Sequence, residues 1–194
     1  MAIVKLSRIV DGLEGAMVED WSFYLDKETG ETFELDDGLA SLLESIEDSL
    51  KEEGMTIESA CALILEDPTH YSFCDFMSDE EAIDYVIGLL GHELIEIEAL
   101  PSYEQYELME DFIETLSDEH EKQLLYVAID GKGAFRRFKD VAFSIDKLQH
   151  YYHYKDKAVF EAAREWCKDH DIEFEDDWEQ VEKTRYLDKG LTPV

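Results

Sequence analysis

Long apolar runs are missing from this chain of 194 residues, and no segment approaches the roughly 18 apolar residues that a membrane-spanning helix needs. Met1 to Leu13 also lacks the apolar core and cleavage site of a signal peptide. The chain contains an odd number of cysteines that lie far apart in the sequence: Cys61, Cys74 and Cys167. This number and spacing argue against a disulfide framework or a zinc knuckle. We therefore expect a soluble cytoplasmic protein with buried reduced thiols and no membrane contact.

Basic side chains are absent from residues 52–121, which carry 21 acidic groups and neither Lys nor Arg. Residues 1–51 hold 4 basic and 13 acidic groups, whereas residues 122–194 hold 13 and 15. The formal net charge of -32 repels polyanions, so binding of nucleic acid is not expected. The acidic excess favours solubility, and it also suits a partner with a basic face.

Enough apolar material is present to fold, because 45% of the residues are hydrophobic and 12% are aromatic. The chain contains no internal repeat, low-complexity block or Gly/Ser linker. This composition predicts a single α+β domain over residues 1–175. Residues 176–194 are polar and weakly periodic, which predicts an acidic, partly ordered C-terminal tail.

Two kinds of hydrophobic period predict the fold class. Apolar residues alternate in residues 21–25 and 32–35, with a Thr29-Gly30 turn between them, and again in residues 93–99. Helical spacing covers most of the remaining chain, and Ser78 with Glu81 forms a capping box. We expect a mostly helical α+β protein in which helices cover a small antiparallel sheet, made of the N-terminal hairpin and a strand near 93–99.

The segment from Gly131 to Lys139 is the most distinctive in the chain and the candidate anion-binding site. Two glycines at the start of a helix leave backbone N–H groups pointing outward, where the helix dipole favours an anion. Guanidinium groups bind phosphate or carboxylate through parallel hydrogen bonds. The alternative is that the glycines only separate two helices while the basic side chains pair with the protein's own carboxylates. The candidate residues are Gly131, Lys132, Gly133, Arg136, Arg137 and Lys139.

Nucleotide chemistry finds no support in this segment, because no strand precedes the glycines and no G-K-[ST] sequence ends the loop. Phe135 and Phe138 could stack on bases, but their spacing places them on the core face of the helix. The pattern therefore indicates an anion site without base recognition.

Metal binding has only weak signals. His150 and His153 share a helix face and could hold a metal together with a third ligand such as His120, but no His-Glu-x-x-His pattern is present. Asp26 to Glu31 superficially resembles a calcium loop, yet Glu31 stands where that loop requires Gly. A solvated histidine pair and a hairpin turn explain these residues better, so no metal and no cofactor is expected.

Several short segments form a recognisable pattern: Tyr24-Leu25-Asp26, Thr29-Gly30-Glu31, Met109 to Glu114, Gly131 to Asp140 and Ala163-Arg164-Glu165-Trp166. Together they resemble a bacterial group, uncharacterised protein family 0158, over roughly residues 3–175. The resemblance implies a bacterial, cytoplasmic protein and supplies no catalytic residue.

The function that the sequence favours is a non-enzymatic binding or regulatory module. Its Gly131–Lys139 face would contact an unidentified protein or a small anionic ligand that carries phosphate or carboxylate. One alternative is an enzyme acting on a small anionic metabolite, with Arg136 and Arg137 positioning the substrate and an unidentified carboxylate as base. Another is a nucleic-acid mimic whose acidic residues 52–121 bind a basic protein.

Overall fold

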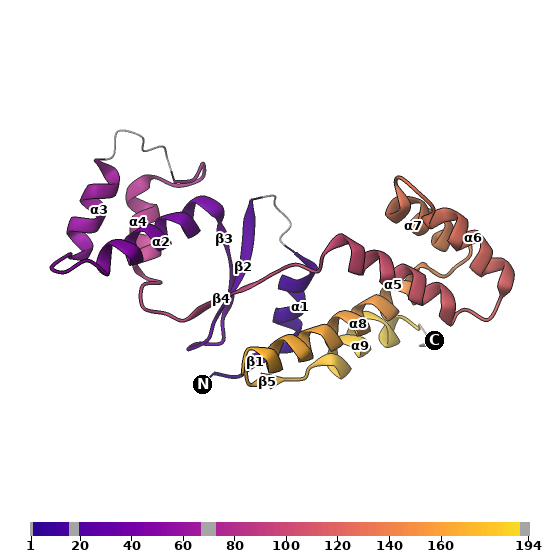
Figure 1. Cartoon of the computed structure of the whole chain (residues 1–194). Helices are drawn as coiled ribbons and strands as arrows, with labels where there is room; N and C mark the ends of the chain where they lie inside the picture. The colour runs from indigo at the N-terminus through magenta and orange to yellow at the C-terminus, as the bar shows by residue number, and fades with distance from the viewer. Residues whose placement is uncertain (1, 16–19, 67–72, 191–194) are drawn as a thin grey trace. The chain divides into compact units, whose positions relative to one another are not determined.

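The computed structural model describes residues 2–15, 20–66 and 73–190 (Figure 1). The chain forms two compact units: unit 1 comprises residues 1–2 and 16–97, and unit 2 comprises residues 3–15 and 98–194. In the sequence, unit 1 is therefore inserted between two parts of unit 2. The expected division into one domain over 1–175 and a tail over 176–194 stays a prediction.

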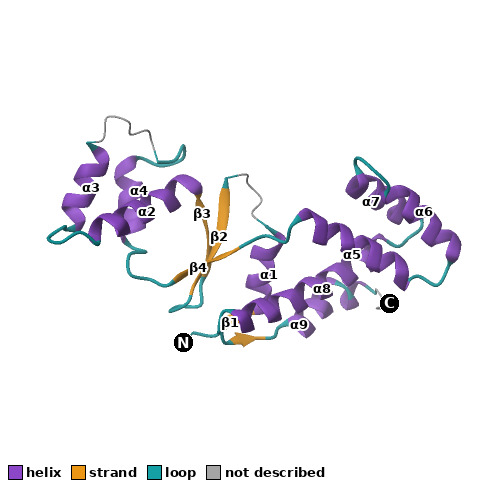
Figure 2. Cartoon of the chain, in the orientation of Figure 1, coloured by secondary structure: helices purple, strands orange, loops and turns teal. Residues whose placement is uncertain are grey.

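A three-stranded antiparallel sheet forms in unit 1 (Figure 2). Its central strand, β2 (Trp21–Asp26), pairs with β3 (Thr32–Asp36) on one side and with β4 (Leu94–Ile97) on the other. Leu25 lies opposite Thr32 in β3 and opposite Ile95 in β4, and it is fully buried. The hairpin and the later strand that the alternating pattern predicts are both confirmed.

The turn between β2 and β3 is organised by one buried carboxylate. Asp26 accepts hydrogen bonds from the backbone N–H of Glu28 and the hydroxyl of Thr29, each at 2.8 Å, and its other neighbour is the Nδ1 atom of His92 at 2.8 Å. Gly30 adopts a φ of 74°, in the left-handed region that glycine tolerates. These bonds hold the segment as a hairpin turn, in agreement with the sequence.

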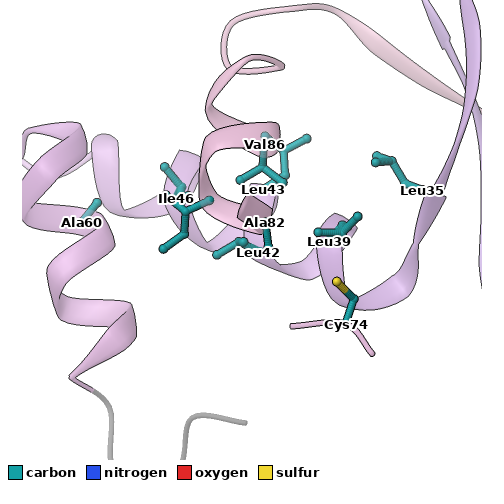
Figure 3. Close-up of a cluster of buried hydrophobic side chains, with 10 residues drawn as sticks. Leu35, Leu39, Leu42, Leu43, Ile46, Ala60, Cys74, Ala82 and Val86 are labelled. Atoms are coloured by element: carbon teal, nitrogen blue, oxygen red, sulfur yellow. The ribbon is translucent and has the colours of Figure 1, made fainter. Parts of the chain in front are cut away.

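The described part of unit 1 also contains α2 (Asp37–Leu50), α3 (Ile57–Leu65) and α4 (Asp79–Ile87), and both α3 and α4 pack against α2, which contacts β3. The predicted capping box of Ser78 and Glu81 begins α4. Leu43 and Ile46 of α2 and Val86 of α4 belong to one buried cluster (Figure 3). Phe33 and Leu94 of the sheet pack against the same cluster, so the helices cover the sheet through apolar contacts.

Unit 2 is almost entirely helical. The elements of unit 2 are β1 (Val4–Lys5), α1 (Leu6–Glu14), α5 (Ser102–Thr115), α6 (Glu119–Ile129), α7 (Ala134–Ser144), α8 (Leu148–Asp169), β5 (Phe174–Glu175), α9 (Trp178–Arg185) and a 3-10 turn at Leu187–Lys189. The two short strands β1 and β5 are parallel and pair Val4 with Phe174. Helix α6 packs against α7, and α1 packs against α8.

An aromatic cluster forms part of the core of unit 2. Phe112 of α5 and Phe138 of α7 are fully buried, and both rings meet Tyr151 of α8 edge to face, with centroids 5.4 Å and 4.6 Å from the tyrosine ring. Edge-to-face pairs add roughly 0.5–1.5 kcal/mol to the stability gained from burial. This cluster holds α5, α7 and α8 together.

Polar side chains fix α9, although none of its residues is buried. The hydroxyl of Ser7 donates to Asp177 at 2.6 Å, and His153 of α8 meets Glu182 at 2.7 Å. Buried Asp156 of α8 accepts from Arg185 at 3.0 Å and from the hydroxyl of buried Tyr186 at 2.6 Å. Residues 178–186 are therefore docked on α1 and α8.

The fold class is confirmed as mostly helical α+β with a small antiparallel sheet. Among the described residues, no helix combines the length and the apolar character needed to cross a bilayer. Cys74 and Cys167 are buried, and Cys61 is half-buried. Burial raises the pKa of the Cys167 thiol to about 11, so this side chain stays protonated and packs as an apolar group.

Candidate functional site

Residues 131–139 connect α6 to α7 and begin α7. Gly131 and Gly133 adopt φ values of 79° and 81°, a conformation that side chains resist. Gly133 is the residue before α7, and its carbonyl accepts the first helical hydrogen bond, from the backbone N–H of Arg137 at 3.2 Å. The two glycines thus reverse the chain between two packed helices.

Arg137 binds the end of the preceding helix. Its Nε donates to the carbonyl of Ala128 at 3.0 Å, and its two terminal nitrogens donate to the carbonyls of Asp130, Gly131 and Lys132. The last carbonyls of a helix lack partners within the helix, and a cation there also suits the helix dipole. Arg137 therefore caps α6, through backbone carbonyls where the sequence alternative expected carboxylates.

A second side chain completes this cap. The hydroxyl of Tyr106, from α5, donates to the carbonyl of Ile129 at 3.1 Å. At the end of α6, the carbonyl of Ile129 thus accepts a hydrogen bond from α5, and the carbonyl of Ala128 accepts one from Arg137 of α7. The cap joins three helices of unit 2.

The other basic candidates project from this turn into solvent. The side chain of Arg136 is 91% exposed, and its nearest carboxylate, that of Asp140, lies 4.0 Å away. Lys132 and Lys139 are exposed, and neither forms an ion pair within the described part of the chain. Arg136 and Lys139 lie three positions apart on α7 and share one side of it, and Lys132 lies in the turn just before the helix. We call Lys132, Arg136 and Lys139 the basic face.

Aromatic side chains divide between the core and this surface. Phe138 is buried as the sequence predicts, but Phe135 is 37% exposed and Phe143, one turn beyond Lys139, is 75% exposed. Val127 of α6 is 70% exposed. Large apolar groups thus accompany the basic face on the hairpin of α6 and α7.

Both histidines of the weak metal signal line one cavity of about 500 Å³ in unit 2, which we call the histidine cavity. His153 is 6% exposed and its Nε2 lies 2.7 Å from Glu182, while Nδ1 of His150 is buried without a hydrogen-bond partner among the described residues. Those residues contain no group of three or more His, Cys, Asp or Glu placed to hold a metal ion. The full lining is Thr115, His150, His153, Tyr154, Lys157, Ala158, Glu161 and Glu182.

A cavity of the same volume, about 500 Å³, lies in unit 1 between the sheet and α2, and we call it the acidic cavity. Its acidic lining residues are Asp37, Glu44, Glu47 and Glu96. Burial raises the pKa of Tyr24 in this cavity, and the nearby carboxylates of Glu96, Asp37 and Glu44 raise it further. Residues 131–139 line neither cavity.

Two of these features are not predicted from the sequence. Glu182 falls within the tail expected over residues 176–194, where no partner of His153 is expected. Arg136 and Arg137 are equivalent in the sequence pattern, although only Arg137 reaches the end of α6. A signal for the first was available in Trp178, Val181 and Arg185, which recur at helical spacing near the end of the chain.

The comparisons with known proteins give one match. The model of an uncharacterised protein family (UPF0158) matches residues 69–188. The resemblance is therefore confirmed but differently bounded: the match leaves out the hairpin segments at 24–26 and 29–31, and it includes α9. No curated protein and no solved structure matches the chain.

Proposed function

The chain belongs to the uncharacterised protein family UPF0158, and we propose that it is a non-enzymatic binding module whose basic face holds a carboxylate-rich segment of a partner protein. Lys132, Arg136 and Lys139 provide the charge, and Phe135 and Phe143 provide apolar contact area. Arg137 is outside the proposed contact surface, because its guanidinium group binds the end of α6.

The exposure of Arg136 is the observation that carries this proposal. In a protein with 49 acidic and 17 basic residues, a side chain 91% exposed and 4.0 Å from its nearest carboxylate is left available to an outside group. Arginine and aromatic residues are enriched at protein interfaces and contribute much of their binding energy. An acidic partner segment with apolar residues complements such a surface.

A protein partner fits this face better than a nucleic acid. The segment 131–139 contains four basic and no acidic residues, but the chain as a whole carries a formal charge of -32. A long polyanion would extend beyond the basic face and meet the acidic remainder of the protein, whereas a short acidic peptide segment would not. We place this interaction in the cytoplasm, consistent with Cys61 and Cys167, which form no disulfide.

The test is a charge reversal of the basic face, Arg136→Glu with Lys139→Glu. Partners are captured on the wild-type chain by cross-linking, and the acidic partner is then purified and titrated by calorimetry. Loss of an interface residue that contributes about 2 kcal/mol weakens binding about 30-fold, and we expect at least this effect.

The matched control is Lys168→Glu with Lys183→Glu, which changes the net charge equally at exposed positions of α8 and α9. It should bind the partner as the wild type does. Lysine substitutions in the acidic segment of the partner should restore binding to the reversed face. Equal affinity of wild type and Arg136→Glu/Lys139→Glu would reject the proposal.

A further inference from the structure

The histidine cavity brings together residues from three helices of unit 2. His150, His153, Lys157 and Glu161 lie along one side of α8, Thr115 comes from the end of α5, and Glu182 comes from α9. A volume of about 500 Å³ lies within the range of small-molecule sites in proteins, about 300–1,000 Å³. All of these residues fall inside the span matched by the family model.

Glu182 fixes the protonation pattern of His153. An ionised carboxylate can only accept a hydrogen bond, so the Nε2 atom of His153, 2.7 Å from Glu182, carries a proton. Nδ1 is then the acceptor of a neutral ring or a second donor of a charged one. The ring is also held in place by Tyr186, which meets it edge to face at 5.0 Å.

The carboxylates of the cavity are already bound within the protein. Glu182 accepts from His153, and Glu161 pairs with Arg164 at 2.7 Å. Thr115 donates its hydroxyl to the carbonyl of Phe112 at 2.7 Å. The acceptors that would attract a cation therefore have partners.

Two nitrogen-bearing side chains in the cavity have no such partner. Lys157 forms no ion pair among the described residues, although the chain carries nearly three acidic groups for every basic one. Nδ1 of His150 is buried without a hydrogen bond among the described residues, a state that costs free energy. What the cavity offers a ligand is thus the ammonium group of exposed Lys157 and an unpaired ring nitrogen of His150.

We propose that the histidine cavity binds a small organic oxyanion, a carboxylate or a phosphate monoester, through Lys157 and His150, with His153 held beside it by Glu182. Residues 122–194, which supply most of the lining, hold 13 basic and 15 acidic groups, whereas α5, which supplies Thr115, carries five acidic residues and no basic one. At physiological ionic strength, charges more than about 8 Å away are largely screened. This site is separate from the basic face.

The 194-residue chain is titrated by calorimetry with succinate and, separately, with glycerol 3-phosphate, which distinguish a carboxylate ligand from a phosphate monoester. We expect at least one probe to bind, and Lys157→Met to weaken it at least tenfold. Lys168→Met removes an exposed lysine from the same helix outside the cavity and should bind as the wild type does. Arg136→Glu/Lys139→Glu should also leave probe binding unchanged, which separates this site from the proposed partner surface.

His150→Phe keeps an aromatic ring and removes the unpaired nitrogen. This variant should weaken the probe while staying folded, and in the wild type the ¹⁵N resonances of the His150 ring should shift on titration. The proposal is overturned if neither probe binds at a concentration of about 10 mM, which nearly saturates a site with a millimolar Kd, or if Lys157→Met binds as tightly as Lys168→Met.

Discussion

The two units contain cavities of equal volume, about 500 Å³, with different polar linings. In the acidic cavity of unit 1, the lining includes four acidic side chains and no lysine or arginine, and burial together with the nearby carboxylates raises the pKa of Tyr24. In the histidine cavity of unit 2, the carboxylates are bound by His153 and Arg164, and Lys157 is unpaired. Both cavities belong to a chain of formal charge -32, so the difference between them lies in whether the lining carboxylates have basic partners within the protein, and not in the overall charge.

The largest expected effect concerns how separate the two units are. Phe112→Ala removes a fully buried ring from the core of unit 2 and should lower the free energy of unfolding by about 3–5 kcal/mol. Hydrogen exchange followed residue by residue should show the lost protection in α5, α7 and α8 while α2 and α4 keep theirs. An equal loss in α2 and α4 would mean that the units unfold as one.

A smaller effect separates the two neighbouring arginines of unit 2. Arg137→Ala leaves carbonyls at the end of α6 without their partner and should cost about 1.5–3 kcal/mol, the range for hydrogen bonds to charged groups. Arg136→Ala removes an exposed side chain and should change stability by no more than about 0.5 kcal/mol. Urea denaturation of both variants measures the difference, and similar losses from the two would contradict the capping role of Arg137.

The smallest effect is a pH dependence confined to unit 1. The carboxylate of Asp26 raises the pKa of His92, while hydrogen bonds from His92 and Thr29 outweigh burial and lower the pKa of Asp26. His92 makes its full contribution to the free energy of unfolding below the ordinary pKa of histidine, and this contribution is lost as the pH rises through the raised pKa. Asp26 makes its full contribution above the ordinary pKa of aspartate, and this contribution is lost as the pH falls through the lowered pKa. The pair thus stabilises the hairpin most between about pH 4 and pH 6.5.

His92→Gln should remove the part of this dependence above about pH 6.5, measured as the unfolding temperature of unit 1 against pH. Unit 2 provides the internal comparison, because hydrogen-exchange protection of α5 should not change with this substitution. A variant whose pH profile matches that of the wild type would show that the pair does not contribute.

The sheet was predictable from the sequence because its information is local. The alternation of apolar and polar residues predicts β2, β3 and β4, and Gly30 permits the turn. The capping box of Ser78 and Glu81 predicts where α4 begins. Helical spacing likewise places Arg136 and Lys139 on one side of α7, whereas Lys132 precedes the helix and has no such periodicity.

The missed features depend on contacts between distant parts of the chain. Strand β1 has two residues and no readable period, and it pairs with β5 about 170 positions later, Val4 with Phe174. The helical spacing of Trp178, Val181 and Arg185 indicates helix α9, but α9 buries no side chain of its own, so this spacing does not predict that Glu182 and Arg185 hold it to α8. The cap formed by Arg137 uses carbonyl groups, which every residue carries and which no sequence pattern distinguishes.

The insertion of unit 1 within unit 2 fixes an order of events during synthesis. The first strand, Val4–Lys5, and helix α1 leave the ribosome early, but their partners β5 and α8 come much later in the chain. All the residues of the sheet and helices of unit 1 have been synthesised once Ile97 has emerged, whereas α1 at that stage still lacks α8. The apolar side of α1, with its buried Leu6, Ile9 and Val10, therefore has no packing partner on α8 until the last third of the chain has been made.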